Sequence, residues 1–341
     1  TNTQLSIYLN VVHNMNKIFA YIIIFLTLTT CSKDDGTENN ENQLTNENID
    51  IQLTNVNFGI TDIDFININD GFIIDNRGRI LNTQNSGVDW NILHSSNYEL
   101  LDIQFISKQY GYALAKIPNE QSYLLLKTSD YGESFQETSI PNGSDLRKIY
   151  FMSNNIGFVL GNHILKTVDN GSNWTELNLD FNIWRDLIEK YNGELYACGL
   201  NGTFLKSTDT GTNWEQIDLG INSHLYQIQA FQDVFYFRGQ RITKTNIGTT
   251  QEFEIPANLM DLKVYKENIV IGFGEQYPEQ GFYPRGAMFI SNNSGADWET
   301  SLFNEFNRIR VVDFIDSNNG FGIADDLFNG KEYLIKIKIE E

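Results

Sequence analysis

Apolar and polar residues alternate along most of the chain in short runs, and each run ends in a turn rich in Gly, Asn, Asp or Ser. "IDFININDGFIIDNRGRILNTQNSGVDW" (Ile63–Trp90) and "IYFMSNNIGFVLGNHILKTVDNGSNW" (Ile149–Trp174) show the same order of runs and turns. Alternation with a period of two over roughly four to eight residues predicts β-strands rather than helices. The chain is therefore predicted to be all-β.

The same unit returns along the chain, which predicts a repeat architecture. Each unit has an apolar strand, a second strand that starts with Gly and an aromatic residue, a third strand that ends in Thr or Ser, and a turn with Gly before Trp or Phe. The turn glycines are spaced 45, 39, 40, 37 and 47 residues apart; they are Gly87, Gly132, Gly171, Gly211, Gly248 and Gly295. A period of about 40 residues is typical of a four-stranded propeller blade, and a solenoid of such units is the alternative.

The two ends of the repeat array decide between a ring and a solenoid. The last unit, Val312–Ile337, stops without its final turn and strand, whereas Ile49–Val56 precedes the first unit as a strand without a partner. Placing Ile49–Val56 as the outer strand of the last blade closes the ring and leaves no exposed edge. We therefore predict a seven-bladed β-propeller of four-stranded blades over residues 49–341.

The phrase that recurs at the turns has a structural explanation. "LKTVDNGSNW" (Leu165–Trp174) returns as "LKSTDTGTNW" (Leu205–Trp214). A short Asp or Asn side chain accepts hydrogen bonds from turn N–H groups, Gly takes a positive φ, and the aromatic residue packs beneath the hairpin. We interpret the phrase as scaffold rather than as an active site. It resembles the Asp-box of sialidase-repeat proteins, and the residues that carry this likeness are Asp130, Gly132, Asp169, Gly171, Trp174, Asp209, Gly211, Trp214, Gly295 and Trp298.

The array as a whole resembles the photosystem II stability/assembly-factor-like propellers. Phe65 followed by Gly71-Phe72, and Phe151 followed by Gly157-Phe158, each lead into an Ile-Leu-x-Thr strand that carries the likeness. The resemblance implies a propeller and specifies blades rather than chemistry. Plant and cyanobacterial members of that family act as assembly chaperones through a basic arginine patch. Because this chain is strongly acidic, we do not carry the photosystem function over to it.

The N-terminal residues are predicted to be a targeting signal rather than part of the fold. Residues 1–14 lack an initiating Met, so Met15 is the expected start and residues 15–30 the expected signal peptide. The apolar run Ile18–Leu28 is too short for a comfortable membrane-spanning helix. "LTTC", which ends in Cys31, resembles the lipobox of bacterial lipoproteins and implies lipidation of that thiol. An ordinary secretory peptide with a chance cysteine is the alternative.

Residues 31–48 form an Asn-, Glu- and Asp-rich stretch with almost nothing to bury, which predicts a disordered tether. "SKDD" directly after Cys31 resembles the acidic signal that exports Bacteroidetes lipoproteins to the outer face of the outer membrane. The expected location is the bacterial outer membrane, with a lipid anchor on Cys31 and the propeller facing the cell surface or the periplasm.

Composition and charge remove several classes of function. A net charge of −20 repels phosphate backbones, so no nucleic-acid partner is expected. With only two cysteines, and four histidines of which no two have the spacing of metal ligands, we expect neither a disulfide framework nor a metal site. No motif indicates a cofactor. "DIDFININD" (Asp62–Asp70) places Asp62 and Asp64 on one strand face, but its spacing does not match an EF-hand, so calcium at this strand stays an alternative.

One departure from the repeat is a candidate binding site. The sixth unit inserts "GEQYPEQGFYPRG" (Gly274–Gly286) where other units have short turns. Loops at this position line the ligand-binding face of many propellers, and aromatic residues beside Arg have the composition of a binding hot spot. A loop that packs its aromatics onto its own blade is the alternative. The candidate ligand-binding residues are Tyr277, Phe282, Tyr283 and Arg285, together with Trp184 and Arg185 ahead of the fourth inner strand.

These features favour a monomeric, non-enzymatic binding or scaffolding lipoprotein with a protein or glycan ligand. The alternative is a glycan-active enzyme on the same scaffold, such as a sialidase, although the Arg-Ile-Pro phrase typical of sialidases is absent. A compact cluster of arginines that faces paired carboxylates in the central funnel would favour the enzyme. An aromatic rim without such a cluster would favour binding.

Overall fold

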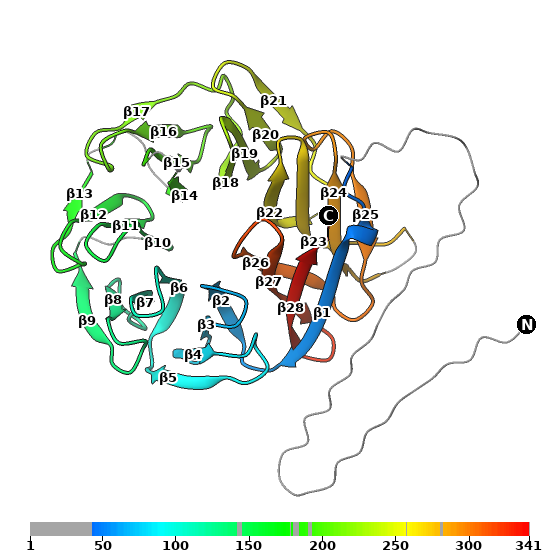
Figure 1. The fold of residues 1–341 in the computed structure, drawn as a ribbon. Helices are drawn as coiled ribbons and strands as arrows, with labels where there is room; N and C mark the ends of the chain where they lie inside the picture. Colours follow the sequence, from blue (N-terminus) through cyan, green and yellow to red (C-terminus); the bar gives the residue numbers. More distant parts are fainter. Residues whose placement is uncertain are drawn as a thin grey trace, which may run out of the picture. The chain divides into compact units, whose positions relative to one another are not determined.

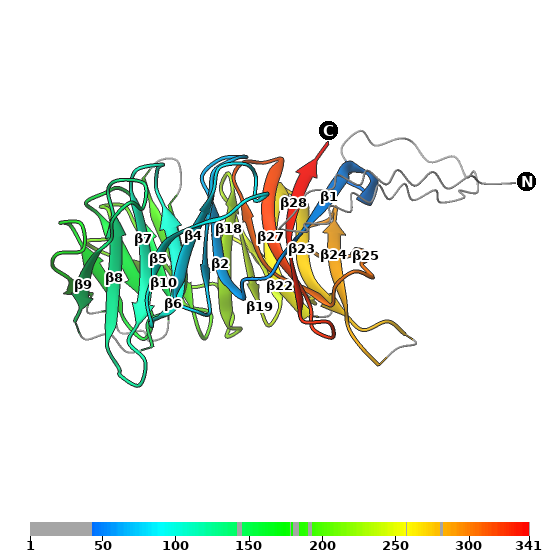
Figure 2. The same cartoon turned by 90° about the horizontal axis from the view of Figure 1, so that it is seen from below.

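The computed structural model describes residues 43–340, apart from positions 142–144, 178, 180–183, 190–192, 257 and 280–281. These residues form seven four-stranded antiparallel sheets around a common axis, which Figure 1 shows along the axis and Figure 2 from the side. The predicted seven-bladed β-propeller is confirmed. No helix in the described part of the chain is long and apolar enough to cross a membrane.

The strands of blades 1 to 6 run outwards in sequence order, so the first strand of each blade is the innermost (Figure 1). Blades 1 to 3 contain β2 (Ile60–Phe65), β3 (Gly71–Asp75), β4 (Arg79–Thr83), β5 (Asn91–Ser95); β6 (Glu99–Phe105), β7 (Gly111–Lys116), β8 (Tyr123–Thr128), β9 (Gln136–Ile140); β10 (Lys148–Phe151), β11 (Gly157–Leu160), β12 (Ile164–Thr167) and β13 (Thr175–Glu176).

Blades 4 to 7 continue the ring, and blade 7 takes its fourth strand from the beginning of the chain. They contain β14 (Trp184–Glu189), β15 (Leu195–Gly199), β16 (Phe204–Ser207), β17 (Glu215–Gln216); β18 (Leu225–Phe231), β19 (Val234–Gly239), β20 (Ile242–Thr245), β21 (Thr250–Phe253); β22 (Asn258–Lys266), β23 (Ile269–Gln276), β24 (Arg285–Ser291), β25 (Glu299–Leu302); β26 (Arg308–Phe314), β27 (Asn319–Asp326), β28 (Lys331–Ile339) and β1 (Ile49–Val56).

The N-terminal strand closes the ring as predicted. β1 pairs with β28 in antiparallel register, from Ile49 opposite Ile339 to Val56 opposite Glu332. The pairing uses every residue of β1, so the outer edge of β28 is covered. Because an uncovered edge strand is a template for aggregation, this closure removes the liability that the last blade would otherwise have.

The folded chain begins before the expected boundary at residue 49. A 3-10 helix spans Asn46–Asn48, and Leu44 is only 5% exposed in the core shared by blades 6 and 7. The backbone N–H of Leu44 donates to Asn292 Oδ1 (2.8 Å), and Asn292 Nδ2 donates to the carbonyl of Leu44 (2.9 Å). Residues 43–48 of the expected tether thus pack on the propeller, whereas residues 31–42, the predicted signal peptide and Cys31 lie outside the described residues.

The Gly-aromatic pair that starts the second strand of many units is explained by packing. The ring of Phe65 in β2 lies against Gly71 in β3, where a Cβ atom would come within 2.4 Å of that ring. The next residue, Phe72, stacks on Phe105 of blade 2 with ring centroids 3.4 Å apart. The glycine therefore makes room for a ring of its own blade, and the aromatic residue joins that blade to its neighbour.

The recurring turns are held by local hydrogen bonds at the outside of each blade. In the turn between β12 and β13, the N–H of Gly171 donates to Thr167 Oγ1 (2.9 Å), and this hydroxyl donates to Asp169 Oδ1 (2.9 Å). Asp169 Oδ1 also accepts from the N–H of Asn173 (2.8 Å), and Gly171 has a φ of 71°. The N–H of the turn glycine donates to a Thr or Ser hydroxyl in the same way at Gly87, Gly132, Gly211 and Gly295.

The tryptophan after the turn is anchored by the turn itself. Its indole N–H donates to the carbonyl of the turn glycine at 3.0, 3.2 and 3.0 Å in Trp90, Trp214 and Trp298. In the standard turns both the turn glycine and the residue before it have a positive φ, as Gly171 (71°) and Asn170 (62°) do. In the fifth unit Ile247 keeps its positive φ (69°) but Gly248 does not, so this turn departs from the standard conformation.

Candidate functional site

Large apolar side chains are exposed on two neighbouring loops at one face of the ring. The loop between β23 and β24 carries Tyr277, Phe282 and Tyr283, which are 55, 93 and 61% exposed. The loop between β27 and β28 carries Leu327 and Phe328, which are 51 and 57% exposed. We call these five residues the aromatic patch. The other exposed large apolar residues of the described part are Val88, Ile92, Val168, Ile247 and Leu302.

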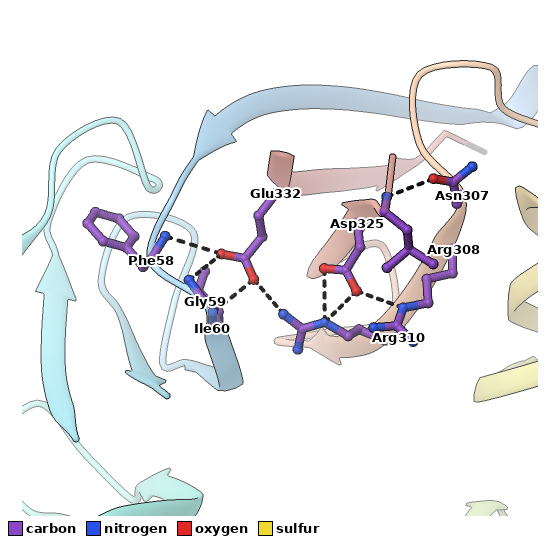
Figure 3. A network of polar contacts seen from close by, with 9 residues as sticks. Phe58, Gly59, Ile60, Asn307, Arg308, Arg310, Asp325 and Glu332 are labelled. Carbon is purple, nitrogen blue, oxygen red and sulfur yellow. Dashed lines mark hydrogen bonds and ion pairs between the residues drawn. The ribbon is translucent and has the colours of Figure 1, made fainter. Parts of the chain in front are cut away.

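Direct contacts hold the two loops of the aromatic patch together. The rings of Tyr283 and Phe328 meet edge to face, with centroids 4.4 Å apart and planes at 69°. Asn307, which precedes β26, spans both loops: its Nδ2 donates to the carbonyl of Pro284 (3.0 Å), and its Oδ1 accepts from the N–H of Leu327 (2.7 Å; Figure 3). The half-buried amide of Asn307 thus links the two halves of the patch.

Each loop is also ordered from within. Asp326 Oδ1 accepts from the N–H groups of Phe328 and Asn329 (3.2 Å each), and Asn329 Nδ2 donates to Asp326 Oδ2 (2.6 Å). At the base of the other loop, the N–H of Gly286 donates to the carbonyl of Phe306 (2.9 Å), where a Cβ on Gly286 would come within 2.2 Å of the phenyl ring. The turn that carries Leu327 and Phe328 and the base of the other loop are therefore fixed by hydrogen bonds within the protein.

The structure separates the predicted site residues into two groups. β23 and β24 extend to Gln276 and Arg285, so most of the predicted insertion Gly274–Gly286 is a hairpin, and its positions 280–281 lie outside the described residues. Arg285 begins β24 opposite Gln276 and is exposed beside the patch. Trp184 and Arg185 begin β14 in blade 4, with the whole of blade 5 between them and the patch. The side chain of Trp184 lies outside what the structure describes.

Aspartates of the innermost strands join each blade to the next around the ring axis. Asp102 accepts a hydrogen bond from the N–H of Ile149 (2.7 Å) and Asp261 one from the N–H of Val312 (2.8 Å). Such contacts supply between blades the backbone partners that sheet hydrogen bonds supply within them. We call this set the axial aspartates; it consists of Asp62, Asp64, Asp102, Asp186, Asp261 and Asp313.

Burial changes the proton affinity of several axial aspartates. It raises the pKa of Asp102 well above its usual range, and the nearby carboxyl group of Asp62 raises it further. Burial likewise raises the pKa of Asp64, with Asp313 adding to the effect, and raises the pKa of Asp313 to about 7. Withdrawal from water disfavours the charged form of a carboxyl group, and a second carboxylate nearby acts in the same direction.

The carboxylate oxygens that would bind calcium at Asp62–Asp70 already accept hydrogen bonds from the protein. Asp62 and Asp64 lie on the same side of β2, as expected from the alternation, and accept hydrogen bonds from the N–H groups of Ile103 and Phe105 in β6. Asp70 instead accepts from Asn67 Nδ2 (2.9 Å) in its own turn. Within the described ranges, no group of three or more His, Cys, Asp or Glu side chains is arranged to hold a metal ion.

The arginines of blade 7 are engaged in ring closure. Arg308 and Arg310 donate to Asp325 (2.7 and 3.0 Å), and Arg310 also donates to Glu332 (2.5 Å; Figure 3). Glu332 in turn accepts from the N–H of Gly59 (3.0 Å), ahead of the innermost strand of blade 1. Of the two carboxylates that these guanidinium groups face, Glu332 thus links the last blade to the first.

Sequence reasoning missed two residues of the aromatic patch and the asparagine that links its loops. Leu327 and Phe328 lie in a four-residue turn of ordinary length, so no insertion marks them, although two apolar residues within "DDLFNGK" are unusual for an exposed turn. Asn307 was missed because its role depends on its contact with two loops that the sequence places 23 residues before it and 20 residues after it.

Together, the fold and the site define a seven-bladed β-propeller with an aromatic patch on one face and an acidic axis. No protein-family model matches the chain, and no curated protein matches it in sequence. Solved structures match it in fold. YCF48 bound to a D1 peptide is 18% identical, with 87% of this chain and 99% of that chain covered and a TM-score of 0.65.

Two further solved structures are similar over most of the chain. YCF48 from Cyanidioschyzon merolae is 16% identical, with 84% of this chain and 98% of that chain covered and a TM-score of 0.60. The GH74 enzyme from Niastella koreensis is 17% identical, with 80 and 52% covered and a TM-score of 0.59. At these identities the likeness concerns the fold, and it supports the propeller expected from the assembly-factor-like repeat.

Proposed function

We propose that the protein is a lipid-anchored, non-enzymatic binding or scaffolding propeller that holds a protein or glycan ligand on the face with the aromatic patch. The observation that carries the proposal is the patch itself: Phe282 is 93% exposed, and four more large apolar side chains beside it are at least half exposed. A gathered, exposed apolar surface on a monomeric protein marks an interaction site. A similar fold, YCF48, is bound to a D1 peptide, which supports a protein as the ligand class.

The anchor in this proposal is Cys31. Its lipobox-like context and the acidic residues after it fit a Bacteroidetes-type outer-membrane lipoprotein. Leu44 binds Asn292, which follows the last residue of β24, whereas the aromatic loop precedes the first residue of β24. Seven residues of strand span about 20 Å, so the anchored end of the chain joins the ring at the face opposite the patch.

Replacing Cys31 by Ser tests the anchor. We expect the wild-type protein in the membrane fraction of its host and the variant in the soluble fraction, because a multiply acylated cysteine holds a protein firmly to a bilayer. A variant that stays in the membrane fraction would disprove the anchor and leave the binding role of the patch open to its own test.

A glycan and surface-protein array tests the binding role. We expect the protein to bind a defined ligand and the double variant Tyr283→Ala, Arg285→Ala to bind it roughly tenfold or more weakly, because truncation of a central anchor costs about that much. The matched control, Val88→Ala with Val168→Ala, removes exposed apolar side chains on other blades and should bind normally. Equal binding by both double variants removes the patch from the proposal, and turnover of an arrayed glycan would contradict the non-enzymatic role.

The glycan-active alternative needs guanidinium groups free to bind a substrate carboxylate. Arg308 and Arg310 are instead paired with Asp325 and Glu332 inside the closing network. The arginines do face two carboxylates, but these contacts hold the blades together and leave neither guanidinium free for a substrate carboxylate, which supports a structural role.

A further inference from the structure

We infer that the aromatic patch binds an apolar segment of a basic partner protein. This inference rests on the proposed function and deepens it, since it selects a protein over a glycan and states the chemistry of the partner. Three properties of the patch carry it: its apolar composition, the charges around it and its size.

The polar side chains that lie beside the patch, those of Asp326, Asn329 and Asn307, are already engaged in holding its loops. Both carboxylate oxygens of Asp326, the amide nitrogen of Asn329 and both polar atoms of Asn307 take part in the hydrogen bonds that shape the loops. Sugar hydroxyls need such groups free beside the ring on which the sugar stacks. Phe282, Leu327 and Phe328 carry no polar side-chain atom at all, so their complement is apolar side chains rather than a hydroxylated ring.

Carboxylates outnumber basic groups around the patch. The two loops and the segment around Asn307 carry four acidic residues, namely Glu275, Glu279, Glu305 and Asp326, against three basic residues, Arg285, Arg308 and Lys331. Of the three, Arg308 is already paired with Asp325. The whole chain carries a net charge of −20. A field of one sign accelerates the approach of partners of the opposite sign and disfavours partners of the same sign. The complementary segment is therefore apolar at its centre and bears Lys or Arg at its ends.

The patch has the size of an interface core. With roughly 200 Å² for a fully exposed large side chain, its five residues offer on the order of 600 Å² of largely apolar surface. A stable protein–protein interface covers about 800 Å² on each partner, of which the central, desolvated part is apolar and the rim polar. Because Asn307 and the Tyr283–Phe328 contact already order the loops, little conformational entropy is lost when a segment docks.

Selection of a phage-displayed library of random dodecapeptides on the intact protein tests the inference. We expect the selected peptides to be apolar at the centre, rich in Lys or Arg and poor in Asp and Glu. The double variant Phe282→Ser, Phe328→Ser should bind them at least roughly tenfold more weakly, whereas the control variant Val88→Ser, Val168→Ser should bind them normally. Thermal unfolding shows whether both variants fold; the four positions are 43 to 93% exposed, so melting temperatures close to wild type are expected.

Each other outcome overturns the inference in a recognisable way. Selected peptides that are acidic, peptides that bind the patch variant as well as wild type, or no selected peptide at all would each contradict it. Binding of arrayed glycans, of phosphatidylcholine vesicles or of a second copy of the chain that the patch variant loses would assign the patch to another occupant. The glycan outcome would leave the proposed function standing, whereas loss of all patch-dependent binding would remove both.

Discussion

Asp313 at the axis and Asp169 in a peripheral turn both accept backbone hydrogen bonds, yet their pKa values move in opposite directions. Burial raises the pKa of Asp313 to about 7 although the N–H of Phe65 donates to it (2.7 Å). The side chain and backbone of Asn173 lower the pKa of Asp169 to about 2. Asp169 lies in an open turn, whereas Asp313 is enclosed by neighbouring strands that carry further carboxylates.

This difference shows that the environment, rather than the hydrogen bond, decides which form of the carboxyl group is favoured. In the turn, water remains near the carboxylate and the donors simply add to its stability. At the axis, water is withdrawn and Asp62 and Asp261 raise the pKa of Asp313 further. Carboxyl groups at the centre of the ring, such as Asp313, therefore resist ionisation. Carboxyl groups in the peripheral turns, such as Asp169, stay ionised to lower pH.

Removal of an axial aspartate is expected to have the largest effect on stability. Asp186 in blade 4 is 4% exposed, pairs with Lys148 Nζ of blade 3 (2.6 Å) and accepts from the N–H of Ile228 in blade 5 (3.0 Å). Asp186→Ala leaves the lysine without this partner and the N–H unsatisfied, so the free energy of unfolding in urea should fall by about 3 kcal/mol.

Two variants sharpen this result. Asp186→Asn keeps an oxygen for the N–H of Ile228 and loses the charge that faces Lys148, so its stability should lie between those of wild type and Asp186→Ala. Asp50→Ala removes an exposed aspartate from the outer strand β1 and should change little. An Asp186→Ala protein as stable as wild type would show that the axial contacts do not hold the blades together.

The two groups of aspartates should also have opposite effects on how stability depends on pH. The folded pKa of Asp313, about 7, exceeds the unfolded value of about 3.9, so the folded state holds more protons between these limits and loses stability as pH rises through them. The folded pKa of Asp169, about 2, is below the unfolded value, so its contribution is lost as pH falls from about 4 to 2. Urea unfolding from pH 3 to 8 should therefore show maximal stability near pH 4 to 5, with a decline of about 3 kcal/mol towards pH 7.

The Asp313→Asn variant separates the two contributions. Its amide oxygen can still accept from the N–H of Phe65, and it no longer titrates, so the decline towards pH 7 should become shallower while the acid limb is unchanged. A stability curve that rises continuously from pH 4 to 7 would contradict the raised pKa values at the axis.

The fold was predictable because its signals are local. Gly71-Phe72 and the turn Thr167–Trp174 each carry their structural reason within a few residues, and counting the units revealed that Ile49–Val56 had to complete the last blade. Leu44 was not predictable, since one leucine in an Asn- and Glu-rich stretch does not show that blades 6 and 7 will bury it.

The candidate site was predictable only where it lengthened the repeat. The insertion after β23 pointed to Tyr277, Phe282 and Tyr283, whereas Leu327 and Phe328 reach the same surface from the next blade. The axial aspartates were missed for a similar reason: they come from strands roughly 40 residues apart, and only the closed ring places them around one axis.

The smallest loss of stability is expected from substitutions in the peripheral turns. Comparing two of them shows whether the conformation of the turn or its negative charge matters more. Gly171 has a φ of 71°, and a Cβ there would meet the end of the Leu125 side chain, which can shift, so Gly171→Ala should cost about 1 kcal/mol, mainly from backbone strain. Asp169→Asn should change stability at neutral pH less than this, because Asn85 and Asn293 accept the same hydrogen bonds in other turns. Urea unfolding of both variants checks the order. If Asp169→Asn were the more damaging, the negative charge of the turn, rather than its shape, would be what the repeat preserves.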